Sequence, residues 1–165
     1  MAKLSTSRRM HGLILTALTS GARKGELQRM RWDNTDLDQK IAEVGTDHKT
    51  GRYRTLILSD DVVSELKTYR RQRPDALIFC GANPYQPYDE RREWRRLRAD
   101  LGLHDLHFHD LRHIAATRML KAGASTLATS QVLGHADTRM LARRYGSLET
   151  ITLKDVVEKA AGGLK

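Results

Sequence analysis

The spacing of apolar residues near the start of the chain predicts two consecutive helices. The first helix carries its apolar residues at the i, i+3, i+4, i+7 and i+8 positions of one face: Met10, Leu13, Ile14, Ala17 and Leu18. Gly21 marks the turn that ends this helix. Residues 22–32 then predict a second helix, in which Arg23 shares a face with Leu27 and Met30 and so points toward the core or a cleft.

The next segment predicts a hairpin, a helix and a short strand. Residues 40–59 contain two β-like runs on either side of a polar turn, and Lys49 lies at or near that turn. Ser59 or Asp60 caps a helix that extends to about residue 71. Residues 76–80 are expected to form a further short strand.

The rest of the chain predicts helices separated by glycines. Residues 88–102 predict an arginine-rich helix that Gly102 stops, with a narrow apolar stripe: Trp94, Leu97 and Leu101. From Asp110 onward, three glycines interrupt the helical pattern: Gly123, Gly134 and Gly146. The expected fold class is α+β, a mainly helical single domain with a small three-stranded antiparallel sheet.

Composition narrows the class of partner. The 165 residues include 29 Lys and Arg against 20 Asp and Glu, a net charge of +9, which favours a polyanion such as nucleic acid or an acidic membrane surface. No apolar run approaches the roughly 18 residues of a membrane-spanning helix, so we expect a soluble protein. The single cysteine, Cys80, excludes an intramolecular disulfide framework and fits a reducing cytoplasm.

Several residues are candidates for chemistry, although each also has an ordinary structural role. Arg23 pairs with Glu26 at i+3 on a solvated face, and Lys49 is solvated in its polar turn. In their ordinary structural roles, His135 would begin a helix after a glycine, and Tyr145 would be a core tyrosine with its hydroxyl at the surface. Taken singly, none of them identifies a site.

Arg112 is a stronger candidate because its helix is apolar around much of its circumference. The apolar residues around it span both sides of the helix: Leu111, Ile114, Ala115, Ala116, Met119 and Leu120. A buried guanidinium needs an anionic partner. Asp110 is one such partner, and a phosphate at the helix N-terminus is the other.

A group of histidines raises the question of a metal site: His104, His107, His109 and His113. His109 and His113 lie at i and i+4, the spacing of a zinc-binding helix. Asp110 stands where the zinc-protease motif has its general-base glutamate, and no third ligand is obvious downstream. We therefore expect no metal and no other cofactor.

Four segments together resemble a known family, the tyrosine recombinases or phage integrases, in their catalytic domain. The segments are 18–38 (LTSGARKGELQRMRWDNTDLD), 48–59 (HKTGRYRTLILS), 109–125 (HDLRHIAATRMLKAGAS) and 132–148 (VLGHADTRMLARRYGSL). The resemblance implies that Arg23 and Arg112 bind the scissile phosphate, with Glu26 supporting Arg23. It further implies roles for four residues: Lys49 as the hairpin lysine, His109 as the histidine of HxxR, His135 as the second histidine and Tyr145 as the nucleophile.

The resemblance also implies a function and partners. A site-specific recombinase of this family cuts double-stranded DNA through a 3′-phosphotyrosyl intermediate, without a metal, as a homo-oligomer on the DNA and with accessory DNA-bending or directionality proteins. It works in the cytoplasm at the nucleoid. We expect the helix at 88–102 to contact phosphates through its exposed arginines: Arg91, Arg92, Arg95 and Arg96.

In domain terms, residues 1–165 correspond to the catalytic domain alone, without the DNA-clamping domain that precedes it in the family. Residues 147–165 are expected to form a tail helix that docks on its own body or on a neighbouring protomer. Two other functions stay open. A type IB topoisomerase uses the same bond chemistry, and an inactive DNA-binding remnant is favoured by the interval of ten positions between His135 and Tyr145, one more than is commonest in the family.

Overall fold

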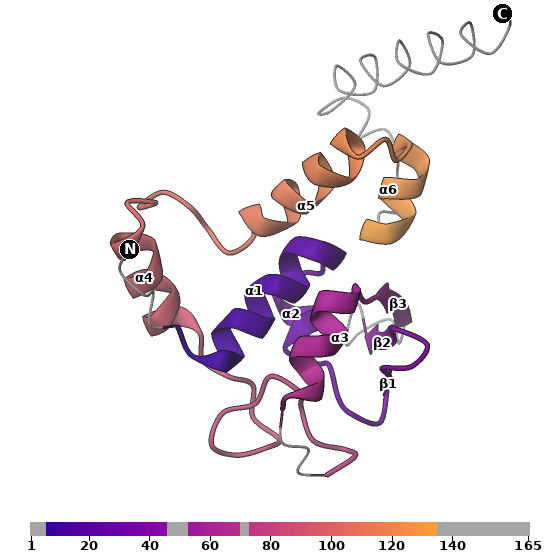
Figure 1. Cartoon of the computed structure of the whole chain (residues 1–165). Helices are drawn as coiled ribbons and strands as arrows, with labels where there is room; N and C mark the ends of the chain where they lie inside the picture. Colours follow the sequence, from indigo (N-terminus) through magenta and orange to yellow (C-terminus); the bar gives the residue numbers. More distant parts are fainter. Residues whose placement is uncertain (1–5, 46–52, 70–72, 135–165) are drawn as a thin grey trace, which may run out of the picture.

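The computed structural model describes residues 6–45, 53–69 and 73–134 (Figure 1). Over these residues the helices are α1 (Arg8–Ser20), α2 (Lys24–Leu27), α3 (Asp60–Lys67), α4 (Arg91–Asp100), α5 (Asp110–Lys121) and α6 (Thr126–Leu133). The strands are β1 (Thr35–Asp36), β2 (Ile41–Gly45) and β3 (Tyr53–Ile57), paired antiparallel in the order β1-β2-β3. The expected fold class is therefore confirmed.

Helix α1 is the element around which the others are arranged. The Ser7 hydroxyl caps its start by accepting the N–H of Met10 at 3.2 Å, and Gly21, at φ +63°, ends it in the left-handed conformation. Its apolar face is the one that the sequence predicted, and it packs against α3 and α5. Helix α4 lies at the start of α1 and α6 lies near its end (Figure 1).

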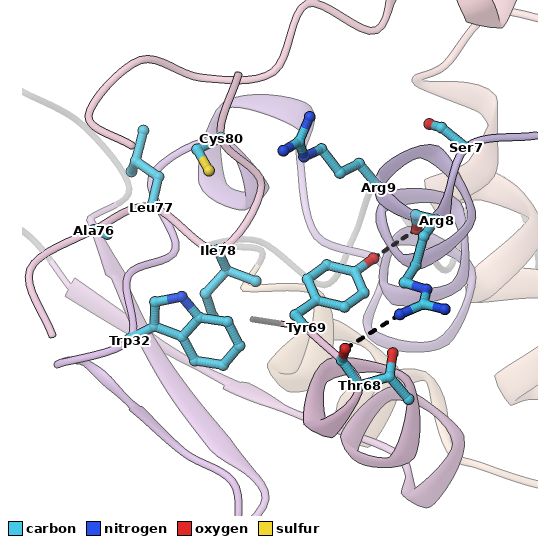
Figure 2. Close-up of a pocket in the computed structure, with 10 residues that line it drawn as sticks. All are labelled: Ser7, Arg8, Arg9, Trp32, Thr68, Tyr69, Ala76, Leu77, Ile78 and Cys80. Carbon is cyan, nitrogen blue, oxygen red and sulfur yellow. Dashed lines mark hydrogen bonds between the residues drawn. The ribbon is translucent and has the colours of Figure 1, made fainter. Parts of the chain in front are cut away.

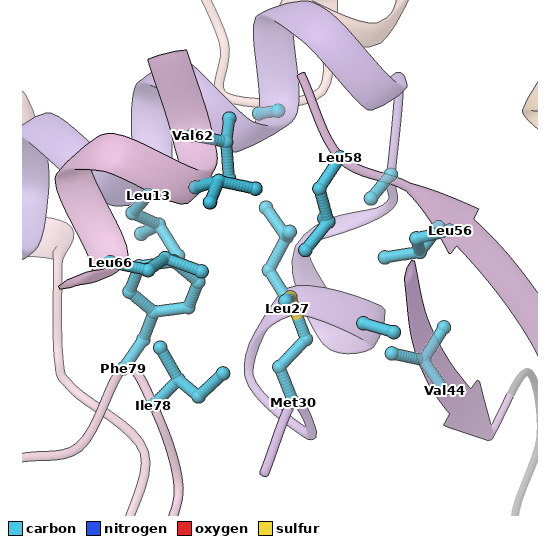
Figure 3. Packing of buried hydrophobic residues seen from close by; sticks show 14 of the residues in the cluster. Leu13, Leu27, Met30, Val44, Leu56, Leu58, Val62, Leu66, Ile78 and Phe79 are labelled. Carbon is cyan, nitrogen blue, oxygen red and sulfur yellow. The ribbon is translucent and has the colours of Figure 1, made fainter. Parts of the chain in front are cut away.

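The main hydrophobic core lies between α1, α3 and the sheet (Figure 3). Its largest fully buried side chains come from all of these elements and from the segments that join them: Met10, Leu13, Leu27, Met30, Leu56, Leu58, Leu66 and Phe79. Burying such a side chain stabilises the fold by about 1.5–3 kcal/mol each. Because Leu27, the last residue of α2, and Met30, just after it, belong to this core, the short α2 is anchored to the core.

Buried and exposed positions alternate along the two strands of the β2–β3 hairpin. Its register pairs Ala42 with Leu56 and Val44 with Arg54, and these positions face the protein interior. The hairpin expectation is confirmed for the two strands, whereas Lys49 lies in 46–52, outside the described residues.

Two expectations about the first half of the chain are wrong. Helix α2 covers four residues and not 22–32, because Ile78 donates its N–H to the Met30 carbonyl at 2.9 Å and draws the chain into a tertiary contact. Residues 76–80 form isolated bridges, such as the one between Arg31 and Leu77, and do not form a strand. The third strand of the sheet is Thr35–Asp36 instead.

Two helix ends also differ from the expectation. Helix α3 stops at Lys67, since the N–H groups of Thr68 and Tyr69 turn back to carbonyls three residues earlier. Helix α4 begins at Arg91 and not at residue 88, whereas Gly102, at φ +68°, follows the C-cap and ends the helix as expected. Leu101, at that cap, is exposed and does not join the apolar stripe. The helices broken at Gly123 and Gly134 are confirmed as α5 and α6. Within the described ranges, no helix has both the length and the apolar character that crossing a bilayer requires.

Candidate functional site

Four segments that are distant in the sequence meet around the end of α1. They are the turn after α1, the start of α5, the middle of β3 and the end of α6. Each contributes a charged side chain or a backbone carbonyl that accepts a hydrogen bond from one. The three guanidinium groups of Arg23, Arg54 and Arg112, with the Glu26 carboxylate between them, are called the arginine cluster below.

Glu26 is the single carboxylate of this cluster, and it is 1% exposed. Its Oε2 accepts the backbone N–H of Arg23 at 2.7 Å, and its Oε1 accepts Nη1 of the same arginine at 3.2 Å. Nη1 of Arg54 lies 3.5 Å from Oε2. The expected Arg23–Glu26 pair is therefore present, but the glutamate belongs to the protein interior and not to a solvated face.

Arg112 is 4% exposed, as the apolar residues around it predicted. Its Nη1 donates to the Gly21 carbonyl at 2.6 Å and its Nη2 to the Leu133 carbonyl at 2.8 Å. Asp110 is not its partner, because that carboxylate accepts the N–H of His107 at 2.7 Å. Burial, followed by the charges of Arg23 and Arg54, lowers the pKa of Arg112 to about 10, so the group stays cationic at neutral pH.

Arg54 is a member of the cluster that the sequence analysis missed. Its side chain is 8% exposed, and its Nη1 donates to the same Leu133 carbonyl that Arg112 uses. Its Nε and Nη2 are buried without a hydrogen-bond partner among the described residues. The signal that identifies it is the alternation of β3, in which residue 54 faces inward together with Leu56.

Counted together, the arginine cluster holds three positive charges and one negative charge. Buried cations without full compensation are costly, and an anion that reaches them removes part of that cost. Arg23 gives access to such an anion because its side chain is 44% exposed, in contrast to the two other arginines. Planar guanidinium groups bind phosphate through paired N–H donors, so the cluster is suited to a phosphate group.

His109 lies three residues before Arg112, at the cap position of α5, and its ring is exposed. It packs edge-on against His113 with 5.3 Å between the ring centroids. In the part of the chain that the structure describes, no three His, Cys, Asp or Glu side chains are grouped as metal ligands would be. Lys49, His135 and Tyr145 lie outside the described residues.

The arginine-rich helix α4 lies away from the cluster. The Ser7 hydroxyl, at the start of α1, donates to Glu93 of α4 at 2.8 Å, whereas the cluster adjoins the end of α1. Along α1 these two ends are separated by about 20 Å, given 1.5 Å per residue. Arg91 pairs with Asp89 at 2.8 Å, and all four expected DNA-contacting arginines of α4 are exposed.

Tyr69 lies in a separate pocket of about 450 Å³ (Figure 2). Its hydroxyl donates to the Arg8 carbonyl at 2.6 Å, and burial, with the negative charge of Glu65 next, raises its pKa. Tyr53 is exposed on β3. Both tyrosines are therefore distinct from the arginine cluster.

Comparisons with known proteins agree with the resemblance. Residues 1–150 match the phage integrase family. The shufflon-specific DNA recombinase of Escherichia coli is 30% identical over 133 residues, which are 80% of this chain and 33% of that protein. The chain spans about a third to about half the length of the curated relatives that it matches.

Solved structures share the fold. The crystal structure of XerA recombinase has a TM-score of 0.71 at 23% identity, covering 93% of this chain and 58% of that one. The catalytic domain of bacteriophage HP1 integrase has a TM-score of 0.67 at 20% identity, covering 90% and 80%. The match to the family confirms the expected family, and the solved structures confirm the expected fold. The chain belongs to the phage integrase family and has the fold of a tyrosine recombinase catalytic domain.

Proposed function

We propose that this chain is the catalytic domain of a site-specific recombinase that cuts and rejoins double-stranded DNA through a 3′-phosphotyrosyl intermediate, without a metal ion. The observation that carries the proposal is the arginine cluster, with three guanidinium groups around one buried carboxylate. The phosphodiester in the transition state gathers negative charge on its equatorial oxygens, and preorganised cations stabilise that charge. Family membership supports the same function.

Arg23 and Arg112 are the proposed phosphate ligands. Arg112 uses two of its five N–H donors on carbonyls, which fixes the plane of its guanidinium before substrate arrives. Arg23 is held by Glu26 while its side chain stays partly exposed. Two arginines with different exposure, one rigid and one accessible, suit a phosphate that enters from the surface.

Tyr145 is the proposed nucleophile. Its oxygen bonds to phosphorus, the bond from phosphorus to the 5′-oxygen breaks, and a 3′-phosphotyrosyl linkage remains. A free phenol has a pKa of about 10, so only about one in a thousand is ionised at neutral pH, and His109 is the proposed acceptor of its proton. Lys49 is proposed to protonate the departing 5′-oxygen, and His135 to donate to a phosphate oxygen.

The covalent linkage keeps the energy of the phosphodiester bond. Attack by another 5′-hydroxyl therefore rejoins the DNA in the reverse of these steps, with no need for ATP. We further propose that the exposed arginines of α4 contact the DNA backbone, that several protomers assemble on the DNA, and that accessory proteins set the direction. The net charge of +9 supports the choice of DNA as partner.

A nicked suicide duplex tests the proposal. Once the strand is cut, the short fragment that carries the new 5′-hydroxyl diffuses away, and the covalent protein–DNA adduct remains. We expect the adduct with the unaltered chain, also in excess EDTA, and none with Tyr145→Phe, whose DNA affinity stays nearly unchanged. Tyr53→Phe is the matched control and retains the adduct.

Other outcomes select the other functions. Binding without any adduct indicates an inactive DNA-binding protein. An adduct that forms equally on every sequence, with relaxation of supercoils, indicates a type IB topoisomerase. Loss of the adduct in EDTA and its recovery with zinc or magnesium contradicts the metal-free mechanism.

A further inference from the structure

The inward-facing position 54 of β3 holds an arginine where the alternation of the strand calls for an apolar residue. Leu56 faces the core from the same side of the strand, whereas Tyr53 and Ile57 are exposed. An arginine at such a position loses its hydration, and burial lowers the pKa of Arg54 while Glu26 opposes the shift. Because burying the Arg54 guanidinium costs free energy, we expect this side chain to have a function beyond packing.

The contacts of Arg54 join three elements of the site. From β3, its Nη1 lies 3.5 Å from Oε2 of Glu26 in α2 and donates to the carbonyl of Leu133 at the end of α6. Gly134 lies against the same side chain, since a Cβ placed there would be 2.5 Å from Cδ of Arg54. Arg54 thus contacts the two groups, Glu26 and the Leu133 carbonyl, that hold Arg23 and Arg112.

We propose that Arg54 is a positioning residue that sets the geometry of the two phosphate-binding arginines. It acts on Arg23 through Glu26, because it engages Oε2 and leaves Oε1 to hold the Arg23 guanidinium. It acts on Arg112 through the Leu133 carbonyl that both arginines share. This inference rests on the proposed function of Arg23 and Arg112.

The consequence of removing Arg54 follows from these contacts. Without it, the Glu26 carboxylate is free to rotate and to hold the guanidinium of Arg23, and not only its backbone N–H, by both oxygens, which draws that guanidinium away from an incoming phosphate. The Leu133 carbonyl would keep a single donor, and Arg112 would gain freedom to tilt. A displacement of about 1 Å in such a group lowers a reaction rate by about 100-fold.

A purely structural role makes a different prediction. Two nitrogens of Arg54, Nε and Nη2, are buried without a partner among the described residues, so the arginine is poorly compensated. Removing this guanidinium leaves the Glu26 carboxylate paired with Arg23, so no buried charge loses its last partner, and it relieves the repulsion that Arg54 exerts on Arg112. Arg54→Met should therefore keep or raise the free energy of unfolding while it lowers the cleavage rate. If Arg54 only stabilised the fold, its replacement would lower both quantities.

The chain offers a matched control in Arg29. Its Nε and Nη2 donate to the Gly45 carbonyl at 3.1 and 2.9 Å, so it holds the other strand of the same hairpin. Its side chain makes no hydrogen bond to Glu26 or Leu133 among the described residues, and its backbone N–H, which donates to the Glu26 carbonyl at 3.0 Å, stays in place when the side chain is replaced. Arg29→Met therefore reports what loosening the hairpin does by itself.

The experiment compares Arg54→Met, Arg54→Lys and Arg29→Met with the unaltered chain. Single-turnover adduct formation is measured at saturating suicide duplex, together with duplex affinity and urea unfolding. We expect both Arg54 variants to form adduct about 100-fold more slowly, with affinity within about 3-fold and with stability retained in Arg54→Met. Lysine fails to rescue because its side chain is one bond shorter, so its ammonium keeps the charge but does not reach the position from which Nη1 contacts Glu26 and the Leu133 carbonyl.

The proposal is overturned if Arg54→Met cleaves at the unaltered rate, if Arg54→Lys restores the rate, or if Arg29→Met shows the same losses. Should the unaltered chain form no adduct at all, the proposed function fails, and inorganic phosphate then serves as the probe. The rise in melting temperature with phosphate, at constant ionic strength, should shrink in Arg54→Lys and not in Arg29→Met. An equal rise in all three proteins overturns the positioning role independently.

Discussion

Glu26 holds Arg23 through both of its carboxylate oxygens: Oε2 accepts the Arg23 backbone N–H at 2.7 Å and Oε1 accepts Nη1 at 3.2 Å. One glutamate thereby orders the start of α2 and the side chain that reaches the surface of the site. Because this carboxylate is buried among cations, its charge matters as much as its hydrogen bonds.

Glu26→Ala is expected to destabilise the fold by about 3–5 kcal/mol, since removing one partner of a buried ion pair leaves uncompensated charge. Glu26→Gln keeps the shape of the side chain and one acceptor, so it should lose less stability than Glu26→Ala. Urea unfolding measures the stability of both variants. Glu43→Gln, on the exposed face of β2, is the control and should unfold like the unaltered chain. An unchanged stability of Glu26→Ala would contradict the assigned pairing.

Arg112→Ala should slow adduct formation by about two to three orders of magnitude, the usual effect of removing one preorganised donor to a developing oxyanion. Arg112→Lys should stay impaired, because an ammonium cannot span the carbonyls of Gly21 and Leu133 as the guanidinium does. Arg118→Ala, exposed on the same helix, is the control. Normal rates in both Arg112 variants would remove this residue from the catalytic set.

Gly134→Ala tests the close approach of the backbone to Arg54. Gly134 and Gly102 have nearly the same φ, +67° and +68°, but a Cβ at Gly134 would meet Arg54, whereas one at Gly102 meets nothing within 4 Å. Both alanine variants should lose about 1–2 kcal/mol from the left-handed conformation. Only Gly134→Ala should also slow cleavage, and equal cleavage by the two variants would count against the contact.

The raised pKa of Tyr69 predicts that the folded protein loses stability at high pH. Its pKa in the folded protein is raised above the ordinary value of about 10, so the unfolded chain releases this proton first as the pH rises. Stability from this group is therefore full below pH 10 and declines above it. Tyr69→Phe loses about 1 kcal/mol at pH 8 with the hydroxyl's hydrogen bond, but its urea midpoint should fall less between pH 8 and 11. Tyr85→Phe, at an exposed tyrosine, should keep the unaltered pH dependence.

The arginines of α4 should contribute to DNA affinity through charge alone. Replacing Arg92 or Arg95 by alanine is expected to reduce the slope of log affinity against log salt by about 0.9 for each phosphate that the variant no longer neutralises. Adduct formation at saturating DNA should stay unchanged. Arg73→Ala, an exposed arginine paired with Asp75, is the control. A salt slope that does not change in either α4 variant would move the DNA-binding surface elsewhere.

Arg112 and Arg54 illustrate what the sequence reveals about this site. Arg112 could be predicted because the apolar residues that surround it in its helix are visible in the residue order itself. Arg54 was missed, since one polar residue in a hairpin is usually exposed. The alternation with Leu56 places it on the inner side of β3, but the pairing with Val44 and the contact with α6 are tertiary facts that the sequence does not contain.

The errors in the fold have the same origin. Residues 22–32 have helical spacing, but the bond from Ile78 to Met30 joins positions far apart in the chain, and no local pattern announces it. Helices with clear caps, such as α1 after Ser7 and α6 after Ser125, could be predicted because their signals are local. Tertiary hydrogen bonds and strand register determine the rest.

The length of α1 has a consequence for the size of the DNA target. Its two ends lie about 20 Å apart and adjoin α4 and the arginine cluster, a distance that corresponds to about six base pairs at 3.4 Å each. A duplex that contacts both ends would meet α4 about six base pairs away from the phosphate bound at the arginine cluster. Under the proposed function, an arm of DNA shorter than this leaves α4 without a phosphate contact while the cluster still binds the scissile phosphate, so we expect the span of one helix to set the minimal DNA arm.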